Sequence, residues 1–326
     1  MATTPVSTTT VSRPGLRDIR PKLSDRIGEP ALKILSTAAG VVSVVVLVWI
    51  AYTVFHQASP AISKFGLGFV TSKTWNPNTD TYGALTFIYG TLVSSFIALL
   101  IATPTAIAIA VYLTELAPRR VRRPVATLVE LLAAIPSVIL GLWGIIILGP
   151  FLENHLEPFL HSFLGWLPLF SGTPSPYGML NAALILTIMA LPIVTAITRE
   201  VFESTPRELK EGAYALGATR WEMVRMTVLP LGRSGVVGAV ILGLGRALGE
   251  AIAVTQVIGN ATQIKASLFE PAGSLAAQVA SEYQGAVSAL NTAALIYLAA
   301  ILLVITVIVN VIARLIVRGR TKVVGT

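Results

Sequence analysis

Six long apolar stretches restrict this chain to folds that cross a lipid bilayer. A helix that spans the hydrocarbon core needs about 20 mostly apolar residues, and each stretch is at least that long. This pattern predicts an all-α polytopic membrane protein with six transmembrane helices. The stretches are Ile34–Phe55, Ala84–Leu113, Val125–Pro150, Tyr177–Thr198, Ser234–Ile258 and Asn291–Ala313.

The composition agrees with a membrane protein and excludes several kinds of site. Only 12% of the 326 residues are charged, whereas soluble domains carry about 25%. The chain has no cysteine, which excludes disulfides, iron–sulfur clusters and zinc–thiolate sites. With three histidines, a His-rich metal site is not expected either. We therefore expect neither a cofactor nor a metal.

The positive charges indicate how the chain is oriented. Lys and Arg gather in both tails and in the loops after the second and fourth stretches, and Lys64, Lys73 and Lys265 alone lie in the opposite loops. By the positive-inside rule, both termini are cytoplasmic. The net charge of +8 is then a topology signal and no sign of nucleic-acid binding. We expect a tail (1–31), a six-span domain (32–318) with a cytoplasmic loop (199–233), and a second tail (319–326).

The second outer loop, residues 151–176, alternates bulky apolar residues with acidic residues and histidines. An amphipathic helix in the membrane interface explains this alternation. A metal site is the alternative interpretation, which we do not favour because an interfacial helix needs the same residues. The four residues concerned are Glu153, His155, Glu157 and His161.

The longest inward loop, Arg207–Gly232, predicts a short helical hairpin. Helix formers run from Pro206 to Leu216, Gly217 supplies a left-handed end, and a second helix from Thr219 to Val228 ends at Pro230. Apolar residues recur at helical spacing in both helices. Amphipathicity alone favours a hairpin on the inner leaflet over one that docks a cytoplasmic protein.

The fifth stretch contains an arginine and a glutamate four residues apart, Arg246 and Glu250. Arg246 lies about 16 Å along a helix from Gly235, near the middle of a core about 30 Å thick. Ionisable residues at this depth usually line a pathway, and a guanidinium attracts anions. A structural ion pair between the two residues is the alternative. Gly245 and Gly249 also permit close helix contact.

Nucleotide binding is not expected within this chain. The glycines from Gly243 to Gly249 have the wrong spacing for a dinucleotide fingerprint, and no strand precedes them. The pattern G-x-x-x-x-G-K-[ST] is absent from the sequence. Any energy from ATP must therefore come from a partner.

The inward loop resembles the EAA loop of the permease subunits of type I ABC importers, which favours the docking interpretation. One position differs from the family's EAA pattern, because Gly212 stands where the family usually has alanine. The resemblance implies that this loop inserts into a groove on an ATP-hydrolysing subunit. The residues that carry it are Glu211, Gly212, Ala213, Gly217, Leu229 and Pro230.

Further segments are similar to the phosphate-importer permeases of PstC type: Tyr82–Leu92, Val129–Val138, Gly141–Gly144 and Gly245–Glu250. The resemblance runs from about Lys33 to Arg318 and implies a non-catalytic permease in the cell membrane. It also implies a second permease (PstA type), two ATPase subunits (PstB type) and an extracytoplasmic phosphate-binding protein (PstS type). Arg246 and Glu250 match family residues that are important for transport.

Other transport functions remain open at this point. A permease for molybdate, sulfate or a peptide shares the same inward loop. A stand-alone secondary transporter needs no docking loop and often has paired broken helices within an inverted repeat, and we expect neither here. A membrane assembly factor does not explain the charges at mid-membrane depth.

Overall fold

This computed structural model describes residues 23–321, and the side chains of 32–118 and 120–315. The described chain is helical and contains no strand, only the isolated bridges Asn76–Thr81 and Gly259–Ala272. Six helices are long and apolar enough to cross a membrane, which confirms the predicted fold class. These spans are Leu32–Phe65, Leu85–Leu116, Ser137–Leu164, Met179–Glu203, Arg220–Gly249 and Ala289–Leu315.

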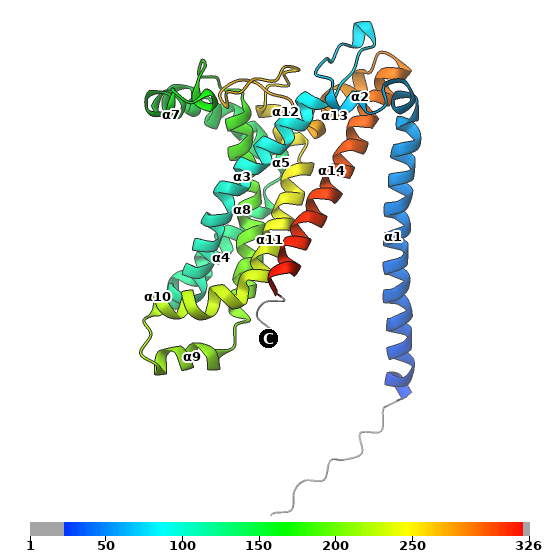
Figure 1. The fold of residues 1–326 in the computed structure, drawn as a ribbon. Helices are drawn as coiled ribbons and strands as arrows, with labels where there is room; N and C mark the ends of the chain where they lie inside the picture. Colours follow the sequence, from blue (N-terminus) through cyan, green and yellow to red (C-terminus); the bar gives the residue numbers. More distant parts are fainter. Residues whose placement is uncertain (1–22, 322–326) are drawn as a thin grey trace, which may run out of the picture. The chain divides into compact units, whose positions relative to one another are not determined.

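The α-helices differ widely in length, because several spans are built from more than one helix (Figure 1). In chain order they are α1 (Leu23–Phe65), α2 (Gly68–Thr71), α3 (Leu85–Val111), α4 (Arg119–Ala134), α5 (Ser137–Trp143), α6 (Gly149–Phe151), α7 (Glu157–Leu164), α8 (Met179–Glu203), α9 (Arg207–Ala215), α10 (Arg220–Met223), α11 (Leu229–Gly249), α12 (Ile252–Val257), α13 (Leu275–Glu282) and α14 (Ala289–Thr321). The expected tails fall partly outside the described residues, at 1–22 and 322–326.

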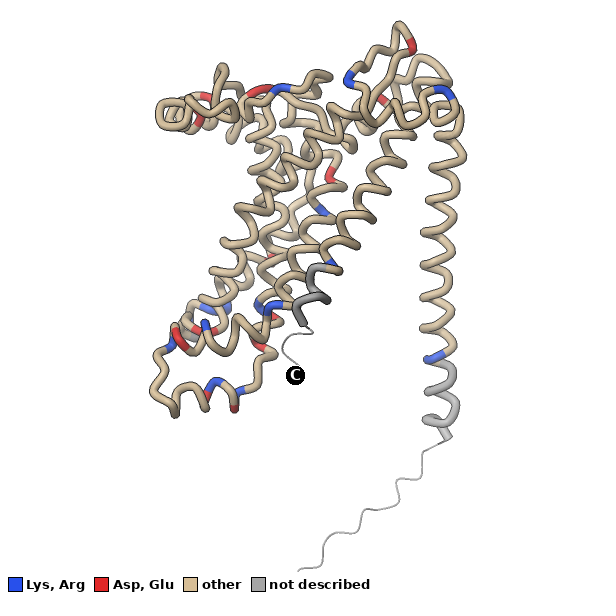
Figure 2. The backbone as a smooth tube through the Cα atoms, in the orientation of Figure 1, with Lys and Arg blue, Asp and Glu red and all other residues tan. Residues whose placement is uncertain are grey.

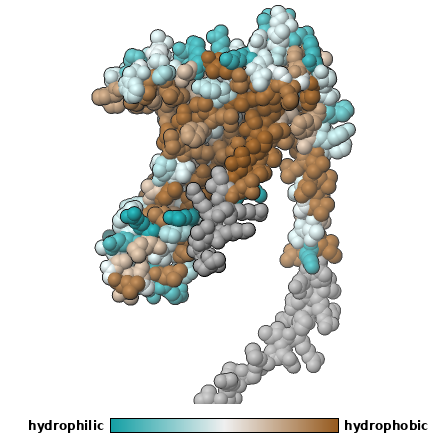
Figure 3. All heavy atoms as spheres, viewed as in Figure 1, coloured by the Kyte–Doolittle hydropathy of each residue, from teal (hydrophilic) through white to brown (hydrophobic). Residues whose placement is uncertain are grey.

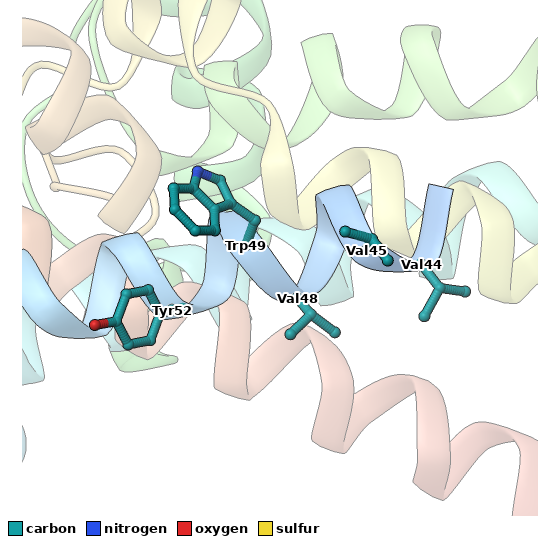
Figure 4. Close-up of a pocket in the computed structure, with 5 residues that line it drawn as sticks. All are labelled: Val44, Val45, Val48, Trp49 and Tyr52. Atoms are coloured by element: carbon teal, nitrogen blue, oxygen red, sulfur yellow. The ribbon is translucent and has the colours of Figure 1, made fainter. Parts of the chain in front are cut away.

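The chain divides into two compact units, Met1–Thr53 and Val54–Thr326. The first unit contains most of α1, and its apolar side chains are exposed. Figure 4 shows an open depression on this helix, lined by Val44, Val45, Val48, Trp49 and Tyr52. Such a surface is suited to lipid or to another apolar helix.

The core of the second unit is a bundle in which α3 packs along α8. Four alanines at a spacing of four residues form a fully buried stripe on α3: Ala98, Ala102, Ala106 and Ala110. Small side chains let two helix backbones approach closely, and the Thr187 hydroxyl on α8 donates to the carbonyl of Ala98 at 3.3 Å. Charged residues gather at the two ends of this unit (Figure 2), and an apolar band lies between those ends (Figure 3).

The third apolar stretch is not the single helix predicted over Val125–Pro150. Helix α4 ends at Ala134, and α5 begins after Pro136. Pro136 lacks an N–H and disfavours a helical conformation at Ile135, which favours the break at this point. Beyond the break, α5, α6 and α7 follow one another through π-helical turns to Leu164. The predicted loop 151–176 therefore begins as helix.

The start of the fifth span also differs from its prediction. Pro230 was expected to end the second helix of the hairpin, but the chain continues from a π-helical turn, Val224–Val228, directly into α11. The wider turn changes the backbone hydrogen bonding just before Pro230, which removes much of the usual conflict between proline and a helix.

At the end of the bundle opposite α9, α2 and the loop that follows it contact α13 and α14. The Trp75 indole donates to the Glu282 carboxylate at 2.9 Å, and the rings of Phe69 and Tyr297 stack with centroids 4.5 Å apart. The Thr91 hydroxyl oxygen on α3 accepts a hydrogen bond from the Leu275 N–H at 2.8 Å. These contacts anchor α3 at this end.

Candidate functional site

The loop after α8 folds into the predicted hairpin, which we call the α9–α10 hairpin (Arg207–Val228; Figure 1). Gly217 has φ +85°, a left-handed conformation that glycine adopts without strain. Its N–H donates to the Tyr214 carbonyl, and the Ala218 N–H donates to the Ala213 carbonyl. These bonds satisfy carbonyls at the end of α9, as glycine-terminated helices commonly do.

A capping box starts the second arm of the hairpin. The Thr219 hydroxyl oxygen accepts from the Glu222 N–H at 3.3 Å, and the Glu222 carboxylate accepts from the Thr219 N–H at 2.8 Å. Two otherwise unpaired N–H groups of the first turn are thereby satisfied. The turn between the two arms is therefore fixed locally, by a glycine and a cap.

The apolar faces predicted for the hairpin are divided between the core and the surface. Ala213 packs, partly buried, against a cluster that includes Phe202, Val224 and Val228. By contrast, Leu216 is 91% exposed and Trp221 is 60% exposed. A large apolar side chain in this position needs a partner surface, since exposed patches of this kind usually mark an interaction site.

The remaining predicted loop residues occupy two different places. Glu211 and Gly212 lie exposed on α9, and a Cβ added to Gly212 would meet nothing within 4 Å. An alanine would therefore fit at the position where the sequence departs from the family pattern. Leu229 and Pro230 begin α11, where Leu229 packs against the same cluster as Ala213.

Arg246 and Glu250 do not form the ion pair considered from the sequence. Among the described residues, no carboxylate lies within 4 Å of the Arg246 guanidinium. Helix α11 ends at Gly249, and Glu250 has an extended backbone (φ −72°, ψ 117°), so the i, i+4 geometry of a helix is lost. The Glu250 carboxylate instead accepts from the Ala253 N–H at 3.3 Å, at the start of α12.

Arg246 is exposed on the surface of this chain and borders the break between α4 and α5. A cavity of about 40 Å³ lies there, with room for water but too small to enclose a larger anion. An unpaired arginine at mid-membrane depth costs about 2.5–3.5 kcal/mol or more unless polar groups or water surround it. The lining residues are Leu132, Ala133, Ile135, Leu140, Met189, Ile193 and Arg246.

The sequence interpretation missed that two of the predicted stretches, Val125–Pro150 and Ser234–Ile258, are interrupted and that the pieces after both breaks pack together. A Cβ on Gly141 of α5 would lie 2.9 Å from the Ala253 Cα of α12, so the backbones nearly touch. The Gln256 side-chain amide on α12 also donates to the Val138 carbonyl of α5, at 3.5 Å. The expectation that paired broken spans are absent is therefore wrong. Pro136 and the Gly141–Gly144 pair were the signals in the sequence.

The four residues considered as a metal site do not come together. Glu157 is fully buried, and its carboxylate accepts from the Ser175 N–H at 2.8 Å, whereas His155 and His161 are exposed. Within the described part of the chain, no three His, Asp or Glu side chains are placed to hold a metal ion. Glu157 acts instead as an anchor for the segment that follows α7.

Comparisons with known proteins agree with this architecture. Residues 102–322 match the family described as "binding-protein-dependent transport system inner membrane component". Curated relatives named phosphate transport system permease protein PstC are 48% identical in Mesorhizobium japonicum, covering 85% of this chain and 86% of that protein, and 45% identical in Xylella fastidiosa, covering 93% and 94%. "PstC 2" of Mycobacterium tuberculosis is 44% identical, covering 94% and 95%.

Solved structures share the fold at low sequence identity. A chain of a bacterial ABC transporter involved in the import of the acidic polysaccharide alginate aligns with TM-score 0.55 at 19% identity, over 89% of this chain and 98% of that one. A chain of the inward-facing MetNI methionine ABC transporter aligns with TM-score 0.52 at 22% identity, over 72% and 94%. The six spans and the family match lead to one conclusion: this multi-pass membrane protein belongs to the inner-membrane components of binding-protein-dependent transport systems.

Proposed function

We propose that this chain is the permease subunit of an ATP-driven phosphate importer. The observation that carries the proposal is Arg246, an exposed guanidinium in a membrane span with no carboxylate partner among the described residues. A guanidinium binds the oxygens of phosphate well, and no carboxylate among the described residues lies within 4 Å to neutralise it. The names of the relatives at 44–48% identity support phosphate as the substrate.

The partners proposed for the chain follow from its exposed surfaces. Arg246 faces out of this subunit, so a second permease of PstA type is needed to enclose the path. Leu216 and Trp221 are exposed on the α9–α10 hairpin and suit a groove on an ATPase of PstB type. The chain itself is non-catalytic in this proposal, because its sequence lacks a phosphate-gripping loop for ATP.

The orientation of the chain is part of the same proposal. The hairpin and both termini lie in the cytoplasm, as the Lys and Arg distribution predicts. The far end of the bundle, with its α13 and the loop around Trp75, then faces the phosphate-binding protein of PstS type. The six-span domain (32–318) and the two tails are proposed with the boundaries given above.

Transport requires that Arg246 and its surroundings hold phosphate only weakly. A site in a path must bind strongly enough to admit an anion and weakly enough to release it. Glu250 follows the end of α11 and accepts a hydrogen bond from the first turn of α12, so its charge lowers the affinity of this region for anions without pairing with Arg246. ATP-driven movement of the hairpin would change the packing of the spans around this region.

The test is phosphate uptake by the complete complex in proteoliposomes. We expect Arg246→Gln to abolish uptake while the second permease and the ATPases still co-purify, and Arg246→Lys to retain part of it because the positive charge remains. Sulfate and molybdate serve as competing substrates. Uptake by Arg246→Gln at the normal rate would overturn the role of the guanidinium. Transport of sulfate in preference to phosphate would identify the chain as part of another importer of this class. Phosphate transport without the ATPase subunits would identify it as a secondary transporter.

A further inference from the structure

A salt bridge joins the α9–α10 hairpin to the end of the second span. The Lys210 Nζ lies 2.6 Å from the Glu115 Oε1, and the two side chains are only 18% and 9% exposed. The Arg199–Glu130 pair, which joins α8 to α4, is longer at 3.2 Å and has 25% and 57% exposure. Because water and salt screen a buried pair less, the Lys210–Glu115 contact is the stronger of the two.

Helix α9 has few other connections to the spans. None of its residues is buried, and its packing on the core cluster is through the partly buried Ala213. A single small side chain gives little resistance to sliding or tilting of a helix. The charged pair between Lys210 and Glu115 is therefore a major restraint on where α9 lies relative to the second span.

Glu115 lies at a point where three elements meet. It belongs to the π-helical turn Tyr112–Leu116 that ends the second span, and its neighbours Leu113 and Thr114 are buried. The Arg122 guanidinium on α4 donates to the Thr114 carbonyl in the same turn. A displacement of Glu115 would therefore act on both α3 and α4.

Helix α3 extends this connection across the membrane. It packs along α8, and at its other end Thr91 accepts a hydrogen bond from Leu275. A force on Glu115 thus reaches the loop that precedes α13 through one continuous helix. Helix α4 leads in turn to the break beside Arg246.

We propose that the Lys210–Glu115 pair is the mechanical link that transmits movement of the α9–α10 hairpin to the second span and to α4. This inference rests on the proposed function, because it assumes that a motor subunit moves the hairpin. Lys210 and Glu115 are positioning residues in this mechanism. The pair keeps the hairpin and the π-helical turn together while both move.

The experiment uses the complete importer in proteoliposomes and measures phosphate transported per ATP hydrolysed. Lys210→Met keeps the aliphatic stem and removes the charge, and Glu115→Gln keeps the shape of the carboxylate. We expect each to lose most of the transport-to-hydrolysis ratio, because ATP would then be hydrolysed without the hairpin moving the second span. The ATPases should still co-purify, because Leu216 and Trp221 are unchanged. Lys210→Arg should retain most of the ratio.

Arg199→Gln is the matched control, since it breaks the more exposed pair near the same end of the bundle, and its ratio should stay near that of the wild type. A wild-type ratio in both Lys210→Met and Glu115→Gln would overturn the link. So would a loss of uptake that is fully explained by loss of ATPase co-purification, because the pair would then serve docking. If the wild-type complex itself carries no phosphate, the proposed function fails, and that failure is distinct from a failure of the variants.

Discussion

The contact between α3 and the segment before α13 is tight enough to predict the effect of a single methyl group. Gly90 lies on α3, and a Cβ added there would be 2.0 Å from the Gly273 carbonyl oxygen. An ordinary contact needs well over 3 Å, so Gly90→Ala must separate the two backbones by on the order of 1 Å. The buried hydrogen bond from the Leu275 N–H to Thr91, 2.8 Å long, would then break or lengthen.

The expected cost combines three effects. Overpacking costs about 1–3 kcal/mol, and a buried N–H left without a partner costs about 1–3 kcal/mol. The better helix propensity of alanine returns about 1 kcal/mol. We therefore expect Gly90→Ala to lower the free energy of unfolding by about 1–5 kcal/mol.

The assay is reversible unfolding in mixed detergent micelles, followed by circular dichroism. The matched control is Gly238→Ala in α11, where a Cβ would meet nothing within 4 Å. This control should be neutral or gain up to about 1 kcal/mol. If Gly90→Ala is as stable as the control, α3 does not approach the Gly273 carbonyl closely enough for an added methyl group to separate the two backbones.

Three further substitutions test the hairpin and the far end of the bundle. Thr219→Ala removes the capping box and should cost about 1 kcal/mol of local stability, seen as faster amide exchange in α10; unchanged exchange would contradict this. Gly212→Ala should stabilise α9 by about 1 kcal/mol, because the added methyl meets no neighbour; slower amide exchange in α9 is the readout, and a loss of protection would count against it. Trp75→Phe removes the hydrogen bond to Glu282 and should cost about 1.5–3 kcal/mol in unfolding; a double-mutant cycle with Glu282→Ala should show coupling, and strict additivity would refute the bond's contribution.

Local features of the chain were predictable from sequence. The six spans follow from length and apolar content, because transfer of a helix into lipid depends on its own residues. The turn of the α9–α10 hairpin was predicted correctly, since Gly217 and Thr219 form their turn and cap with neighbours in sequence, whereas its predicted end at Pro230 was not. The family resemblance identified the class of protein, and the family match confirmed it.

The tertiary structure decided how the charges are partnered and where the spans are interrupted. Arg246 and Glu250 have the spacing of a helical pair, but the helix ends between them, and the piece that follows packs on α5. Lys210 pairs with Glu115, a residue 95 positions away in the sequence. Helical periodicity describes only neighbours within one helix, whereas these contacts depend on which helices pack together. That packing is determined by small residues, such as the alanine stripe on α3, whose partners no local pattern specifies.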